Sequence, residues 1–115
     1  MPEPTTFDVP APGQLVVDVT RDADAIVLAL TGELDLATAP TFDQRMRAAE
    51  ALAPARLVID LSALGFMDST GLQTLLRARE RASAAVHELV LRRGPHQVQR
   101  VFELTRTLEA FAFED

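Results

Sequence analysis

The apolar run AIVLALT at residues 25–31 is the feature that most restricts how this chain can fold. It has no polar residue before its last position, so its side chains do not alternate between a polar, solvent-exposed face and an apolar, buried face. A strand of this kind is buried on both faces and lies in the middle of a sheet. The run QLVVDVT at 14–20 is a second strand, and the polar stretch 21–24 between the two has the length of a hairpin turn. We therefore predict a sheet that begins with an antiparallel hairpin.

The rest of the chain alternates between helical periodicity and short apolar strands. The apolar face of the first predicted helix is formed by Phe42, Met46, Ala49 and Leu52. In chain order the predicted elements are a helix from Ala39 to Pro54 with Thr38 as its N-cap, a strand at 56–61, a helix from Asp68 or Ser69, a strand at 87–91, a helix after Pro95, and a short strand or tail at 111–113.

These elements give an α/β fold in the order β-β-α-β-α-β-α. Strands that are connected through helices form parallel pairs by right-handed crossovers, whereas the opening hairpin is antiparallel. Each helix carries a single apolar stripe, so one layer of helices is enough to bury it. We predict a mixed four- to five-stranded sheet with the helices packed mainly on one face.

Length and composition limit the organisation of the chain and its partners. The 115 residues suffice for one domain, and we predict a flexible Pro-rich lead-in at 1–13 followed by that domain at 14–115. The chain has no cysteine, no apolar run of about 20 residues and no signal peptide, which favours the cytoplasm. A net charge of −6 disfavours nucleic acid and anionic membranes as partners.

Ser69 lies in the run MDSTG at 67–71, which opens the second predicted helix. The start of a helix has unpaired N–H groups and partial positive charge, so a phosphate on Ser69 would be well placed. It would add about −1.5 to −2 charges beside Asp68 and would repel a partner that contacts the free hydroxyl. By itself, however, such a run is more typical of an ordinary N-cap than of a switch.

The run GELD at 32–35 supplies further support. It follows the buried strand at 25–31, and Ser69 follows the next parallel strand along the chain. Loops at the carboxyl edge of an α/β sheet are often neighbours and form binding sites, so we expect Asp35 near Ser69. The alternative is that Glu33 and Asp35 belong to a solvated turn and that Gly32 supplies a positive φ.

The stretch from Leu28 to Leu76 resembles a STAS domain of the anti-sigma factor antagonist class. The matching pieces are LTGELDLATAP at 30–40, LVIDLSALGFMDSTGLQTLL at 57–76 and, more weakly, VQRVFELT at 98–105. The resemblance implies that a GHKL-type serine kinase, which is also an anti-sigma factor, phosphorylates Ser69. It further implies that the unphosphorylated form binds this kinase and frees the sigma factor, and that a PP2C-type phosphatase resets the switch.

The same resemblance assigns roles to individual residues. The partner-binding set that it implies is Asp35, Asp68, Ser69, Thr70 and Gly71, with Ser69 as the phosphoacceptor and Asp68 as the flanking acid. Asp60 matches a strand-end aspartate, which we expect to make a structural hydrogen bond. One departure is Arg106, where the family usually has a glycine; because arginine tolerates positive φ poorly, we expect the third helix to end differently.

The residues also bear on two other classes of function, an enzyme and an adaptor. Catalysis is disfavoured by the motifs. D-S-T-G has one residue too many for an aspartic protease motif, and Met67 stands where the hydrolase motif G-x-S-x-G needs glycine. We expect His87 and His96 to be ordinary, partly exposed residues and not a catalytic base or metal ligands. We therefore predict no enzyme activity, no cofactor and no metal. The remaining alternative is an adaptor of the same fold in a stress-signalling or lipid-transport complex.

Overall fold

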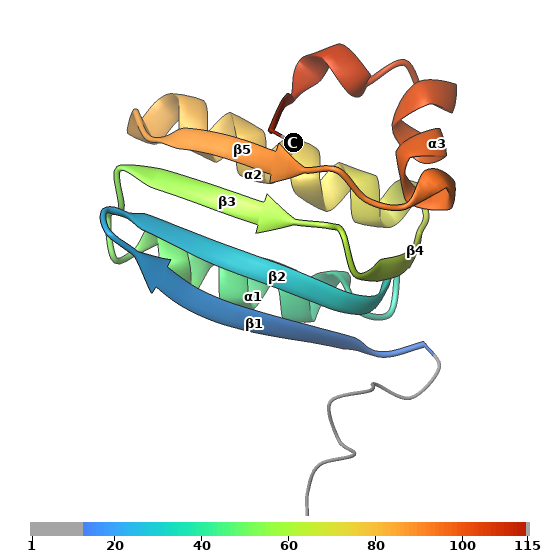
Figure 1. The fold of residues 1–115 in the computed structure, drawn as a ribbon, viewed down its shortest axis with the longest axis horizontal. Coiled ribbons are helices and arrows are strands. Elements are labelled where there is room, and N and C mark those ends of the chain that lie inside the picture. The colour runs from blue at the N-terminus through green and yellow to red at the C-terminus, as the bar shows by residue number, and fades with distance from the viewer. Residues whose placement is uncertain (1–12, 115) are drawn as a thin grey trace, which may run out of the picture.

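The computed structural model of the protein describes residues 13–114, so the lead-in predicted at 1–13 lies outside them except for its last residue, Gly13. The elements, in chain order, are β1 (Leu15–Asp22), β2 (Ala25–Leu34), α1 (Ala39–Glu50), β3 (Arg56–Asp60), β4 (Leu64–Met67), α2 (Ser69–Ala85), β5 (Glu88–Arg92), α3 (His96–Leu104), the short 3-10 helix η2 (Leu108–Ala110) and β6 (Ala112–Glu114). Figure 1 shows α1 and α2 on one face of the sheet and α3 beside β4 at its end.

The sheet is mixed, and its strand order is β1-β2-β3-β5-β6, with β4 also paired to β2. The β1–β2 pair is antiparallel from Leu15↔Gly32 to Asp22↔Ala25, which leaves a turn of only two residues. The pairs β2–β3, β3–β5 and β5–β6 are all parallel. The predicted α/β class, the hairpin, the parallel crossovers and the single main helix layer are therefore confirmed.

The core lies between the sheet and the two helices α1 and α2. Alternate residues of β2, among them Ile26, Leu28 and Leu30, are almost fully buried against the helices, as the period of two in a strand requires. Phe42 of α1 and Leu75 of α2 face them and are 0% exposed. The opposite residues of β2 are also largely covered, in agreement with a central strand.

The sheet has six strands within residues 13–114, more than the four to five predicted, because the link at 62–67 contains β4. β3 pairs with Ala25–Ala29 and β4 with Gly32–Leu34, so the two short strands follow each other along the same side of β2. Four residues that include a glycine and an exposed phenylalanine give almost no periodic signal. The neighbouring strand, not local propensity, therefore determines this element.

The prediction that Leu52 belongs to the buried face of α1 is wrong. The helix ends at Glu50, and Leu52 is 60% exposed. Ala53 takes a left-handed φ of 51° and turns the chain toward β3 before Pro54 is reached. The apolar residues keep helical spacing in the sequence as far as Leu52, but the backbone leaves the helix after Glu50.

The sheet face opposite the helices carries a network of ion pairs. Glu114 contacts both Arg56 and Arg92, and Arg92 also lies 3.6 Å from Asp60. The Asp60 carboxylate accepts a hydrogen bond of 2.9 Å from the Ser62 N–H, which is the structural role predicted for it. Burial acts to raise the pKa of Asp60, but the Ser62 hydrogen bonds and the Arg92 charge outweigh it, so its pKa is lowered.

Within residues 13–114, four residues other than glycine have left-handed backbone conformations. Ala23, Ala53 and Val86 have φ values of 58°, 51° and 62°, and they lie in the loops at the sheet edge opposite Ser69. Arg106 has a φ of 58°, and the N–H of Thr107 donates to the Phe102 carbonyl at 2.9 Å. The helix α3 therefore closes in the left-handed way that glycine favours, and the expectation that Arg106 would change this ending is wrong.

We predict that Arg106→Gly stabilises the protein by about 0.5–1 kcal/mol, because relief of the left-handed strain exceeds the entropy gained by the unfolded chain. Arg100→Gly is the matched control, since Arg100 is exposed inside α3. We expect that control to destabilise by about 1 kcal/mol. Urea unfolding measures both, and a loss of stability in Arg106→Gly would contradict the prediction.

Candidate functional site

Ser69 is the first residue of α2, and its side chain is exposed. The strand β4 leads directly to it, and β4 is fixed by its pairing with the end of β2, where Met67 stands opposite Leu34. The next residue, Asp68, donates its N–H to the Leu34 carbonyl at 3.3 Å. The hydroxyl of Ser69 is therefore presented to solvent from a backbone that the sheet holds on one side.

Asp68 is the N-cap of α2. Its Oδ1 accepts a hydrogen bond of 2.9 Å from the Gly71 N–H, and its carbonyl accepts the N–H of Leu72 at 3.0 Å. The N–H groups of Ser69 and Thr70, in the first turn, have no acceptor within the helix. The ordinary capping role is thus confirmed for Asp68, whereas the Ser69 hydroxyl is not the cap.

Gly71 allows α2 to begin against the end of β2. A Cβ at this position would lie 2.3 Å from the Leu34 carbonyl oxygen and 2.9 Å from its Cγ. No rotamer change relieves a clash with a backbone oxygen, so only glycine fits while the helix stays in place. The role of Gly71 is therefore close packing, which sets the position of Ser69 two residues earlier.

Asp35 organises the turn that follows β2. Its Oδ1 accepts hydrogen bonds from the N–H groups of Ala37 at 3.0 Å and Thr38 at 3.1 Å. The prediction that the Thr38 side chain caps α1 is wrong: its hydroxyl donates to the Glu33 carbonyl at 2.8 Å and accepts from the Asp35 N–H at 2.9 Å. The alternative that Asp35 belongs to a turn is therefore confirmed, and its contact with a partner stays a prediction.

The structure brings the Asp35 and Ser69 loops to the same edge of the sheet. They follow paired residues, Leu34 of β2 and Met67 of β4, and residues of both loops, Leu36 and Thr70, line one groove. This confirms that the two loops are neighbours. The strand that carries Ser69 to this edge is β4, however, and not the predicted strand at 56–61.

Two exposed apolar residues near the site were missed by the sequence analysis. Leu36, in the loop after β2, is 73% exposed, and Phe66, two residues before Asp68, is 46% exposed. The only signal in the sequence was an apolar residue inside a stretch assigned to a turn or link. Large apolar side chains that stay in water beside a candidate site are typical of interaction surfaces.

Residues 13–114 offer neither a metal site nor a membrane span. These residues contain no cluster of three or more side chains suited to hold a metal ion. None of their helices combines the length and the hydropathy that a membrane span needs. His87 precedes β5, and His96 is the first residue of α3.

Comparison with known proteins gives a consistent family. The STAS domain model matches residues 16–115. The anti-sigma-F factor antagonist RsfB of Mycobacterium tuberculosis is 37% identical over 84 residues, which cover 73% of this chain and 69% of RsfB. The level of identity and the coverage are both high enough to show common descent.

Solved structures agree with the sequence comparison. An anti-sigma factor antagonist from Mycobacterium paratuberculosis has a TM-score of 0.79 and 32% identity, over 90% of this chain and 87% of that chain. SpoIIAA of Bacillus in its phosphorylated form has a TM-score of 0.66 and 19% identity, over 87% and 92% of the two chains. The second likeness shows the fold alone.

We predict that Gly71→Ala destabilises the protein by about 1–3 kcal/mol, because the clash with the Leu34 carbonyl exceeds the helix propensity that alanine gains. Gly65→Ala is the control, since a Cβ there would lie 3.4 Å from the Gly32 oxygen. Denaturant unfolding would show the difference. A Gly71→Ala variant as stable as wild type would mean that α2 does not begin where the structure has it.

Proposed function

The chain belongs to the STAS domain family of anti-sigma factor antagonists, and from this premise we propose that it is a phosphorylation switch. Its unphosphorylated form binds an anti-sigma factor that is also a GHKL-type serine kinase, so that the sigma factor is released. Phosphorylation of Ser69 ends this binding, and a PP2C-type phosphatase restores it. The exchange takes place in the cytoplasm.

The observation that carries the proposal is the exposed Ser69 hydroxyl at the first position of α2. Asp68 accepts the Gly71 N–H, which leaves the N–H groups of Ser69 and Thr70 without an acceptor in the helix, and N–H groups at such a helix end favour a phosphate on the serine. The macrodipole of a 17-residue helix favours negative charge there as well. The folded chain therefore tolerates the modification without losing structure.

A phosphate on Ser69 changes the affinity of the partner for the chain. The transfer moves the γ-phosphoryl group of ATP to Ser69 Oγ, the hydroxyl proton leaves with a base of the kinase, and ADP is released. The product carries about −1.5 to −2 extra charges beside Asp68. A kinase surface packed against the neutral hydroxyl then meets bulk and repulsion, and its affinity falls.

The relatives support both halves of the proposal. RsfB is named an anti-sigma-F factor antagonist, which favours an anti-sigma factor as the partner here. SpoIIAA has been solved in a phosphorylated form, so this fold accepts the modification. The identity of the kinase, the sigma factor and the phosphatase for this chain rests on the proposal alone.

We predict that a GHKL-type serine kinase of the same organism, incubated with ATP, adds one phosphate to the wild-type chain on Ser69. Ser69→Ala removes the modification, whereas Ser83→Ala, which changes another exposed serine of α2, leaves it unchanged. Ser69→Asp binds the kinase more weakly than wild type does. Intact-mass and peptide mass spectrometry locate the phosphate, and calorimetry measures the affinity.

Two outcomes would overturn this function. Phosphate found only at other residues, or a Ser69→Asp variant that binds as tightly as wild type, removes Ser69 as the switch. If none of the kinases binds or modifies the chain, a role as an adaptor of the same fold accounts better for its structure.

The two roles of Asp68 can be separated by a pair of variants. Asp68→Asn keeps a capping oxygen and loses the charge, so we predict a stability within about 0.5 kcal/mol of wild type. Asp68→Ala loses the cap and costs about 1 kcal/mol. If the charge contacts the kinase, both variants bind it more weakly by a similar factor; equal binding of wild type and Asp68→Asn would limit Asp68 to capping.

A further inference from the structure

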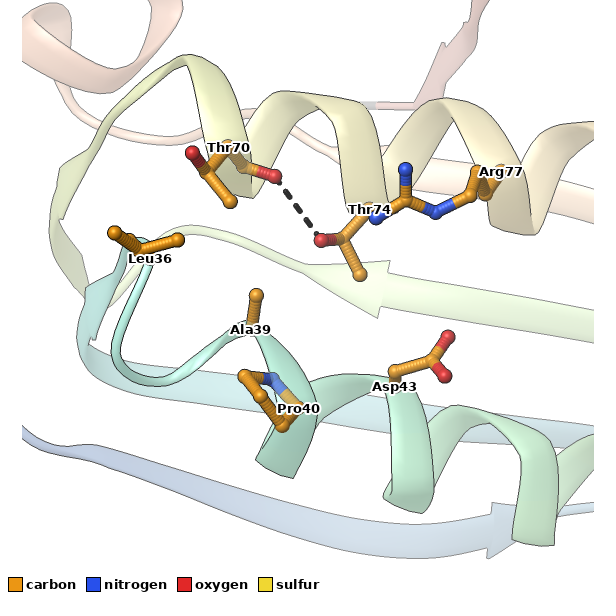
Figure 2. Close-up of a pocket in the computed structure, with 7 residues that line it drawn as sticks. All are labelled: Leu36, Ala39, Pro40, Asp43, Thr70, Thr74 and Arg77. Carbon is orange, nitrogen blue, oxygen red and sulfur yellow. Dashed lines mark hydrogen bonds between the residues drawn. The ribbon is translucent and has the colours of Figure 1, made fainter.

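A groove runs between the start of α1 and the first half of α2, and Figure 2 shows the side chains that line it. Its volume is about 330 Å³. From the side of α1 it is lined by Leu36, Ala39, Pro40 and Asp43, and from the side of α2 by Thr70, Thr74 and Arg77. One wall is therefore apolar except for Asp43, and the other is polar and includes the cation of Arg77.

The apolar wall is held in place by the turn described above. Leu36 is 73% exposed. The residues before and after it are joined by a hydrogen bond of 3.0 Å, which the Ala37 N–H donates to Asp35 Oδ1. Pro40 stiffens the next part of the wall through its fixed φ. A leucine that a rigid turn keeps in water contributes little to folding, and its burial by a partner would be favourable.

The cation at the other end of the groove is available. Arg77 is exposed, and within residues 13–114 no carboxylate is paired with it. The acid that faces it across the groove, Asp43, already pairs with Arg47 at 2.9 Å and lies 3.5 Å from Arg81. Because Arg77 lines the groove, its guanidinium can pair with an acidic group of a molecule that binds there.

The groove is continuous with the Ser69 site. Thr70, the residue after Ser69, forms part of its wall, and its carbonyl accepts a hydrogen bond of 3.0 Å from the Thr74 hydroxyl (Figure 2). The residues of the Ser69 site itself are small and offer little contact area. Tight interfaces depend on a few large anchors, which the groove provides directly beside the phosphoacceptor.

We propose that this groove is a docking site for the kinase that phosphorylates Ser69. A surface segment of the kinase places an apolar side chain against Leu36, Ala39 and Pro40, and a carboxylate of the same segment pairs with Arg77. The groove thereby aligns the kinase on Ser69 and contributes to the choice of partner. This inference rests on the proposed function, since the occupant is the same kinase.

The test uses the full chain and the kinase found to phosphorylate Ser69. Affinity is measured by calorimetry in the presence of ADP for Arg77→Glu and Leu36→Ala. Each has a matched control: Arg79→Glu changes the same charge at an exposed position of α2 outside the groove, and Leu52→Ala truncates an exposed leucine after the far end of α1. Circular dichroism and thermal unfolding check that all four variants fold.

We expect Arg77→Glu and Leu36→Ala each to weaken binding about tenfold and the two controls to bind as wild type does. The Arg77→Glu effect shrinks at high salt, because it is electrostatic, whereas the Leu36→Ala effect does not. If Ser69 is phosphorylated while both groove variants bind like their controls, the docking site is overturned and the switch stands. If no GHKL-type kinase binds or phosphorylates the wild-type chain, so that this test has no kinase to use, the proposed function falls, and the docking site with it.

Discussion

The contact between the first turn of α2 and the end of β2 is the constraint on which the site depends. The Leu34 carbonyl accepts the N–H of Asp68, and the same oxygen lies where a side chain at Gly71 would be. The pairing of β4 with β2 brings the chain to this point. These contacts therefore fix the backbone that carries Ser69, and under the proposed function a phosphate there changes the affinity of the partner without refolding the chain.

Much of the fold followed from the sequence because its strongest signals are global. A strand as apolar as residues 25–31 has to be central, and helical periodicity alternating with strands requires crossovers. The features of the fold that were not predicted are those that the local sequence does not determine. β4 exists because an unpaired stretch of β2 is available beside it, and the exposure of Leu52 follows from where the backbone leaves α1.

The site was predicted in outline and not in its internal bonding. An N-cap and a phosphoacceptor share the same local chemistry, so only the longer family signature distinguished Ser69 from Asp68. In the turn before α1, Asp35 accepts backbone N–H groups, whereas the Thr38 hydroxyl bonds back to Glu33. Which of these two short polar side chains takes which role depends on their rotamers, and both arrangements suit the sequence. The exposure of Leu36 could not be foreseen either, since it depends on the direction in which that turn points the side chain.

The left-handed residues Ala23, Ala53 and Val86 have a consequence for the dynamics of the molecule. All three lie at the edge of the sheet away from Ser69, and none of them is glycine. Residues with a Cβ are strained in this conformation, and loops that carry strain open first. Backbone amides near these loops should therefore exchange with solvent deuterium sooner than the hydrogen-bonded amides of Asp68, Gly71 and Leu72. The strain of these three residues therefore lies at the edge of the sheet away from the proposed recognition site.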